Sequence, residues 1–198
     1  MLISWSRVLA GRLRDPLVGG DLLAGLALGI VGMCVVDAIP IPFVATLAPQ
    51  LMPNAGAFLS LWSWQTITAV GGGLSYVFVL NLVLLLLRRQ WLAALVFVFA
   101  LTLVLAPAYR ADSLIVAARP VFLLVIVWYA LTKFGLLTAV ALMYVHNIVL
   151  AFPLTVNRSA WYANTALFAI ASVLALAAYA FHTTLAGRPP WRQKLHDL

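Results

Sequence analysis

The sequence contains no glutamate, a single cysteine and few charged residues of any kind. Charged residues make up only 9% of its 198 residues, whereas a soluble domain has about 25%. Hydrophobic residues make up 65%, and the mean hydropathy is +1.09. A water-soluble fold of this size has too little interior to bury so much apolar surface. The composition therefore excludes a soluble globular domain and indicates a protein of the lipid bilayer.

The scarcity of acids and cysteine also excludes several kinds of site. Intramembrane metalloproteases need histidine and acidic ligands together with a general base. This chain has no glutamate, and His146 and His182 lie in different apolar runs without the spacing of metal ligands. Cys34 is the sole cysteine, which excludes an intrachain disulfide. We therefore expect no enzyme activity, no cofactor and no metal site in this chain.

Six apolar runs are each long enough, at about 20 residues, to cross roughly 30 Å of hydrocarbon as a helix. The alternating pattern of β-barrel strands is absent. The sequence therefore predicts an all-α fold, a polytopic helical membrane bundle with about six transmembrane helices, preceded by an N-terminal amphipathic interfacial helix. The six runs are residues 22–43, 66–87, 91–109, 113–132, 135–154 and 163–186.

The segment before the first run has the pattern of an amphipathic helix over residues 2–14. Three leucines and Trp5 share one narrow face, and arginines lie opposite. This helix lies either in the membrane interface or against a cytoplasmic protein. Asp21 is the predicted N-cap of the first span, and residues 45–65 are a predicted loop, part of which could lie on the membrane as a short helix. The chain then divides into a juxtamembrane segment, 1–20, a transmembrane domain, 21–187, and a basic tail, 188–198.

The basic residues lie at the ends of the apolar runs and are divided unequally between two sides. Lysine and arginine in short loops favour the cytoplasmic side. With the N-terminus in the cytoplasm, nine of the twelve face inward, and only Arg110, Arg119 and Arg158 face outward. Arg119 either reaches toward the head groups or pairs with Asp112. We therefore predict a multi-pass protein with both termini in the cytoplasm. The net charge of +7 then indicates that the basic residues contact anionic lipid head groups, and a nucleic-acid partner is not predicted.

Four polar residues within the predicted spans are candidates for function: Asp37, Asn81, His146 and Asn147. A polar side chain inside a bilayer marks either a functional path or an interhelical hydrogen bond. For His146 we favour a hydrogen bond that holds the bundle together. Asp37 is followed by two prolines, which favours an interfacial or capping position over an ion path.

Glycines in the first two spans predict close helix packing, and a glycine-rich stretch also permits a bend. The stretch that ends at Ser75 partly resembles the Gly-x-Ser-Gly of rhomboid serine proteases. Tyr76 stands in the place of the closing glycine, so catalysis is not predicted. The glycines that we predict to pack helices are Gly25, Gly29, Gly71, Gly72 and Gly73.

Several short stretches occur together along most of the chain: Leu-Ile-Ser-Trp-Ser-Arg at 2–7, Arg-Asp-Pro-Leu-Val-Gly at 14–19, Lys-Phe-Gly-Leu-Leu at 133–137 and Phe-Pro-Leu-Thr at 152–155. This arrangement resembles the C-terminal multi-pass membrane region of bacterial serine/threonine protein kinases of the Acidobacteria type. Lys133 stands where that family usually has arginine. The glycine-rich loop, His-Arg-Asp and Asp-Phe-Gly motifs of the kinase domain are missing, so the resemblance implies membrane architecture and a kinase connection without kinase activity here.

Two functions are compatible with these observations. The first is a non-catalytic integral membrane anchor or sensor module, for which the resemblance implies a bacterial inner membrane and a cytoplasmic kinase domain as partner. The alternative is a small multi-pass transporter or channel, and a homo-oligomer is a further hypothesis. A transporter should place Asp37, Asn81, His146 and Asn147 on facing helix sides at similar depth.

Overall fold

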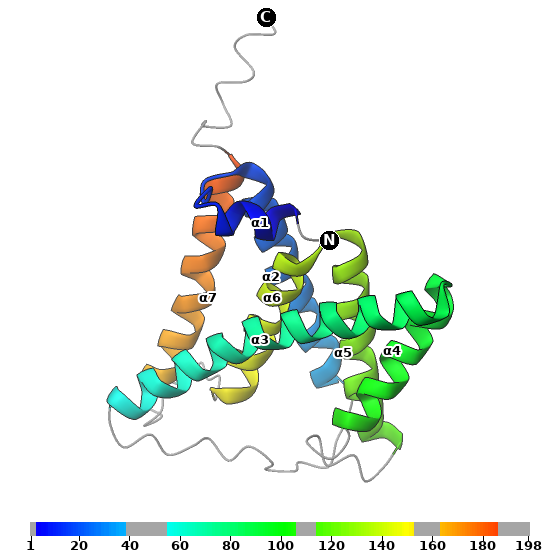
Figure 1. The fold of residues 1–198 in the computed structure, drawn as a ribbon. Coiled ribbons are helices and arrows are strands. Elements are labelled where there is room, and N and C mark those ends of the chain that lie inside the picture. Colours follow the sequence, from blue (N-terminus) through cyan, green and yellow to red (C-terminus); the bar gives the residue numbers. More distant parts are fainter. Residues whose placement is uncertain (1–2, 39–54, 106–113, 153–162, 186–198) are drawn as a thin grey trace, which may run out of the picture.

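The computed structural model consists of seven α-helices and has no β-strand within the residues that it describes, which are 3–38, 55–105, 114–152 and 163–185 (Figure 1). The predicted all-α class is confirmed. The helices are α1 (Ile3–Leu9), α2 (Pro16–Ala38), α3 (Ala55–Leu87), α4 (Gln90–Leu105), α5 (Leu114–Lys133), α6 (Leu136–Ala151) and α7 (Ala163–Thr184).

Helix α6 lies at the centre of the bundle. Eleven of its 16 residues are buried, and it packs against α2, α3, α5 and α7. Helix α3 runs obliquely across the other helices and turns sharply into α4, which packs on α5 (Figure 1). Fully buried side chains such as Phe97, Leu124 and Phe152 come from different segments around this centre. The hydrophobic core is therefore organised around α6.

Among the described residues, three helices are long and apolar enough to cross a membrane: Pro16–Val35, Gly56–Leu87 and Ala163–Thr184. Helices α4 and α6 are also apolar, but their 16 residues span only about 24 Å, less than the roughly 30 Å of a hydrocarbon core. The neighbours of α6 shield it from lipid, so its length need not match the bilayer. Length and composition therefore indicate a membrane protein, and they support three of the six predicted spans.

Helix α3 begins earlier than predicted, so the predicted loop is wrong for residues 55–65. The helix has 33 residues and is about 50 Å long. Its first turns are held by aromatic contacts, since the ring of Phe168 on α7 lies 4.7 Å from Phe58 and 6.0 Å from Trp62. A helix of this length fits a 30 Å core only when strongly tilted. Figure 1 shows that α3 crosses the other helices obliquely.

The N-terminal helix is shorter than predicted, and the prediction of a helix is wrong beyond Leu9. Gly11 adopts a left-handed φ of 75°, which turns the chain back toward α2. Helix α2 begins at Pro16, a residue well suited to a first helical turn. The Leu17 amide donates to the Asp15 carboxylate at 3.0 Å, as at an N-cap. Asp15 therefore caps α2, and the prediction that Asp21 does so is wrong because Asp21 lies inside the helix.

The two short turns, between α3 and α4 and between α5 and α6, also use positive φ angles. Arg88, between α3 and α4, has φ 52°, and Gly135, between α5 and α6, has φ 119°. The amides of Phe134 and Gly135 both donate to the Ala130 carbonyl, at 3.0 and 2.9 Å, which satisfies an orphan carbonyl at the end of α5. Both turns therefore reverse the chain within two or three residues.

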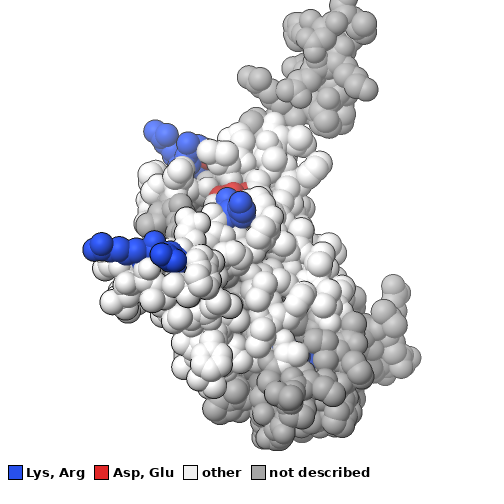
Figure 2. All heavy atoms as spheres, turned by 90° about the vertical axis from the view of Figure 1, so that its right-hand side faces the viewer, with Lys and Arg blue, Asp and Glu red and all other residues white. Residues whose placement is uncertain are grey.

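The helix ends fall into two groups (Figure 1). The upper group in the view holds α1, the α5–α6 turn and the last turn of α7, with the α3–α4 turn somewhat lower at the side, and the lower group holds the opposite ends of the same helices. The first group carries Arg7, Arg12, Arg14, the Arg88-Arg89 pair and Lys133. Figure 2 views the molecule from the right-hand side of Figure 1, and nearly all the blue basic side chains visible there lie in its upper half. A small blue area is also visible lower down. We call the first group the basic end.

Candidate functional site

The most polar part of the interior lies along α6. Four side chains of this helix, which we call the α6 polar set, make hydrogen bonds or polar contacts with three neighbouring helices. The set consists of Thr138, Tyr144, His146 and Asn147.

Thr138 and His146 face α2, and both are buried. The Thr138 hydroxyl donates to the Asp21 carbonyl at 3.0 Å. The Nδ1 atom of His146 lies 3.1 Å from the sulfur of Met33. Because these contacts are about two helical turns apart along α6, they hold α2 against α6 over much of the length of α6.

Glycines let α2 approach α6 this closely. A Cβ atom added at Gly25 would overlap the Thr138 carbonyl oxygen, and one at Gly29 would lie 2.8 Å from a valine Cβ of α6. On α3, a Cβ at Gly73 would lie 2.6 Å from another valine of α6. Gly71 and Gly72 have nothing within 4 Å of that position. Three of the five glycines singled out in the sequence therefore lie in tight helix contacts with α6, and two do not.

Asn147 faces α3 instead of α2. Its Nδ2 atom donates to the Thr68 hydroxyl at 3.2 Å and to the Gln65 carbonyl at 3.3 Å. Asn147 follows His146 directly, and successive residues of a helix project about 100° apart. The two polar neighbours therefore serve two different helix contacts and do not combine into one site.

Tyr144 links three helices. The Trp62 indole N–H on α3 donates to the Tyr144 hydroxyl at 3.2 Å, and that hydroxyl donates to Ser172 on α7 at 3.0 Å. Ser172 in turn donates to the Ala169 carbonyl at 2.8 Å. The phenol oxygen is thus both acceptor and donor, in a chain of hydrogen bonds that crosses the bundle.

The four polar candidates do not converge. Asn81 is exposed on α3 and donates to the Val77 carbonyl of its own helix at 2.8 Å. Asp37 lies in the last turn of α2, where its side chain is outside the described residues. Arg119 has a buried Nε atom without a hydrogen-bond partner in the described part of the chain, and Asp112, its predicted partner, lies outside that part. The geometry shows helix-to-helix contacts at His146 and Asn147 rather than a shared path.

Sequence reasoning missed the contributions of Thr138, Tyr144 and Ser172. Threonine, tyrosine and serine are ordinary residues in apolar helices, and nothing in their spacing sets these three apart. Their partners are 28 to 117 residues away along the chain. Only the packing of α2, α3 and α7 around α6 could reveal them.

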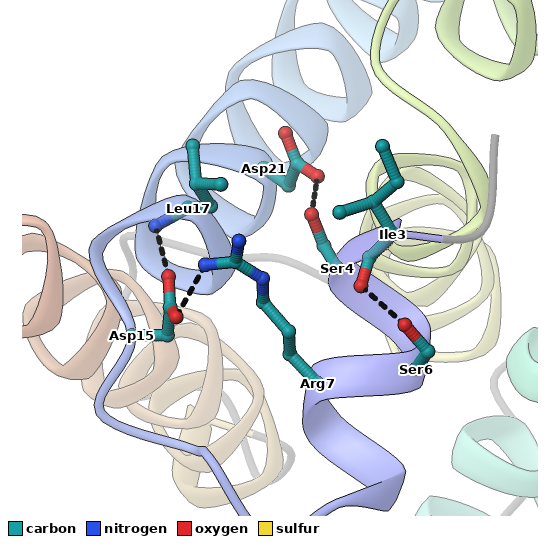
Figure 3. Close-up of polar contacts among 7 residues, drawn as sticks. All are labelled: Ile3, Ser4, Ser6, Arg7, Asp15, Leu17 and Asp21. Atoms are coloured by element: carbon teal, nitrogen blue, oxygen red, sulfur yellow. Dashed lines mark hydrogen bonds and ion pairs between the residues drawn. The ribbon is translucent and has the colours of Figure 1, made fainter.

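A second polar cluster ties α1 to the start of α2 (Figure 3). The Ser4 hydroxyl donates to the Asp21 carboxylate, and Arg7 forms an ion pair with Asp15. The amide hydrogen bond from Leu17, with the Arg7 guanidinium beside it, holds the pKa of Asp15 below its usual value. We call Ser4, Arg7, Asp15 and Asp21 the N-terminal clasp. It fixes α1 across the basic end.

An apolar cavity of about 310 Å³ lies between α2, α6 and α7. Its lining includes Met33, Cys34, Val145 and Ala169, and none of its lining residues is an acid, a base or a hydroxyl residue. Within the described ranges, no three His, Cys, Asp or Glu side chains lie close enough to hold a metal ion. The lining is otherwise apolar and can accept hydrocarbon, and the free Cys34 thiol is its single titratable side chain.

None of the family models, curated proteins and solved structures compared with this chain matches it. The features of this chain that bear on its function are therefore the α6 polar set, the clasp and the basic end, together with the resemblance in its sequence.

Proposed function

We propose that this chain is a non-catalytic membrane anchor or sensor module that works with a cytoplasmic serine/threonine kinase in the inner membrane of a bacterium. The observation that carries the proposal is the α6 polar set. Its buried polar side chains contact α2, α3 and α7, as expected of groups that hold a bundle together.

The proposed topology has six crossings and both termini in the cytoplasm. Its support is the basic end, where α1, the last turn of α7 and both short turns lie together with six of the described basic residues. Lysine and arginine beside membrane spans favour the cytoplasmic side. In this topology, six helices cross the membrane. They are the three longer helices α2, α3 and α7, the central helix α6, and the hairpin formed by α4 and α5.

The proposed kinase partner rests on the resemblance. The N-terminal clasp could transmit a change between a domain bound to α1 and the membrane helices. The Ser-Trp-Ser-Arg stretch lies on α1, and Ser4 binds the carboxylate of Asp21. The Asp21 carbonyl accepts from Thr138 on α6. A domain docked on α1 would therefore be joined through two hydrogen bonds to the central helix, as a sensor requires.

The transporter alternative is less well supported. A transport path needs polar groups that face one another across a continuous route. His146 and Asn147 bond to different helices, and Asn81 is exposed and bonds to its own helix. These positions favour the module.

Reporter fusions and co-purification test the proposal together. Fusions after Arg89, Lys133 and Leu198 should report the cytoplasm, and fusions near Pro53 and Asp112 should report the outside. A serine/threonine kinase should be recovered with the full chain extracted in mild detergent, and less of it with Arg7→Gln, which opens the clasp. A fusion after Leu198 that reports the outside would overturn the six-span count. Failure to recover any kinase would remove the kinase connection.

A further inference from the structure

The turn between α1 and α2 presents two arginines in an unusual setting. Residues 11–16 line an open hollow of about 600 Å³. Three contacts hold the turn in place: the Arg7–Asp15 ion pair, the Leu17 amide bond to Asp15, and a 2.7 Å hydrogen bond from the Tyr179 hydroxyl to the Leu13 carbonyl. The hollow is therefore fixed to both α2 and α7.

Its charge is not neutralised internally. Arg7 pairs with Asp15, the only acid in the lining. Arg12 and Arg14 are exposed, and neither forms an ion pair within the described residues, although the charge of Arg12 helps to lower the pKa of Asp15. Two guanidinium groups thus remain available on one short turn. The planar guanidinium group can donate two parallel hydrogen bonds to the oxygens of a phosphate group.

Apolar side chains surround these arginines on the outer surface. Leu9 is 73% exposed, Leu13 49% and Leu17 51%. Leu17 opens the first turn of α2, one of the three helices able to span a membrane. Exposed leucines beside arginines at the start of a span are the arrangement expected at the boundary between head groups and acyl chains.

We propose that residues 11–16 form a binding site for the head group of one anionic phospholipid, held by Arg12 and Arg14 while its acyl chains lie against Leu13 and Leu17. The combination of unpaired guanidinium groups with adjacent apolar side chains selects a lipid over a free phosphate ion. This inference rests on the proposed membrane placement of the basic end.

The test measures the affinity of the full chain, in detergent micelles, for phosphatidylglycerol and for phosphatidylcholine. Phosphatidylglycerol should bind more tightly, and Arg12→Gln/Arg14→Gln should weaken it by about 30-fold, taking roughly 1 kcal/mol per basic residue. Arg88→Gln/Arg89→Gln is the matched control, because it removes the same charge from the same end of the bundle without touching the hollow. Both pairs are exposed, so both variants should fold.

Equal weakening by the two double variants would overturn the site, as would equal affinity for the two lipids. Inorganic phosphate should compete poorly, and competition as strong as that of phosphatidylglycerol would mean that the site binds a free anion. The result is separable from the topology test. If reporters place the basic end outside but selective lipid binding persists, the proposed orientation fails and the lipid site stands.

Discussion

At the scale of single residues, several polar groups of α6 connect this helix to its neighbours, whereas others, such as Ser75 and Asn81 on α3, bond to carbonyls of their own helix. Tyr144 is the clearest case, since one oxygen atom joins α3, α6 and α7. His146 and Asn147, which the sequence marks as candidates for function, make contacts of the same kind. The polar residues of α6 are therefore explained by their partners on neighbouring helices.

Tyr144→Phe should lower stability by about 1 kcal/mol, because it removes two hydrogen bonds that average about 0.6 kcal/mol each in membrane proteins. For a chain of this size we expect the midpoint of thermal unfolding in detergent to fall by about 2–4 °C. Tyr129→Phe is the matched control, since Tyr129 is exposed at the edge of the bundle. Equal midpoints for both variants and the wild type would show that the Tyr144 chain contributes nothing.

The N-terminal clasp should respond to pH through Asp15. Its pKa is lowered in the folded protein, so the contribution of its carboxylate is fully present above the ordinary value of 3.8 and is lost as the pH falls below it. Hydrogen exchange of residues 3–14 in lipid nanodiscs should show constant protection from neutral pH to about pH 5, and loss of protection below about pH 4. Asp15→Asn should show the low-pH behaviour already at neutral pH. Protection that persists unchanged at pH 3 would mean that other contacts hold α1.

At the scale of helices, the contact between α2 and α6 depends on small side chains. Gly25 and Gly29 lie one turn apart on α2 and meet the backbone and small side chains of α6. Such contacts allow dispersion forces to act between backbones, which matters in a bilayer because lipid tails are as apolar as the helices. The three consecutive glycines on α3, Gly71, Gly72 and Gly73, differ from this pair, since only Gly73 closely contacts another helix.

Gly25→Ala should destabilise the protein by about 1–3 kcal/mol, because the added methyl group overlaps the Thr138 carbonyl and forces the helices apart. Gly72→Ala adds the same group where nothing lies within 4 Å. Alanine favours the helix by about 0.5–1 kcal/mol over glycine, so this control should be neutral or stabilising. Thermal unfolding of the two variants in one detergent gives the comparison. A Gly25→Ala variant as stable as Gly72→Ala would contradict the close packing.

At the scale of the whole molecule, charge separates the two ends of the bundle. Six of the seven described basic residues lie at the basic end, and Arg119 in α5 is the exception. This separation is the physical basis of the proposed orientation, because short basic loops favour the cytoplasmic side.

Replacing Arg88 and Arg89 by Asn should weaken that bias at the turn between α3 and α4. We expect a reporter fused in this turn to give a mixed signal from both sides of the membrane, with the same fusion in the unaltered chain as reference. Lys133→Asn in addition should increase the outside fraction, since it removes the remaining basic residue of the two short turns at this end. A purely cytoplasmic signal from the triple variant would show that other features fix the orientation.

The all-α class and the approximate positions of all seven helices could be predicted from the sequence, because apolar runs and the residues that interrupt them are local properties. The ends of three helices could not be predicted, and one of them is α2, which begins at Pro16 instead of residue 22. Helix α1 stops at Leu9 because the chain turns back to form the clasp, and α3 begins at Ala55, where its first turns pack through Phe58 on α7. Both differences arise from contacts between segments distant in sequence.

The sequence by itself determined that the chain is apolar, helical and asymmetric in charge, since composition and periodicity carry this information directly. Only the tertiary structure decided that α6 is the central helix, that Tyr144 joins three helices, and that His146 and Asn147 serve different contacts. The physical reason is that the sequence shows which side chains are polar and must form hydrogen bonds inside an apolar bundle. The hydrogen-bond partner of each polar side chain depends on which helix faces it, and the packing of the helices determines this.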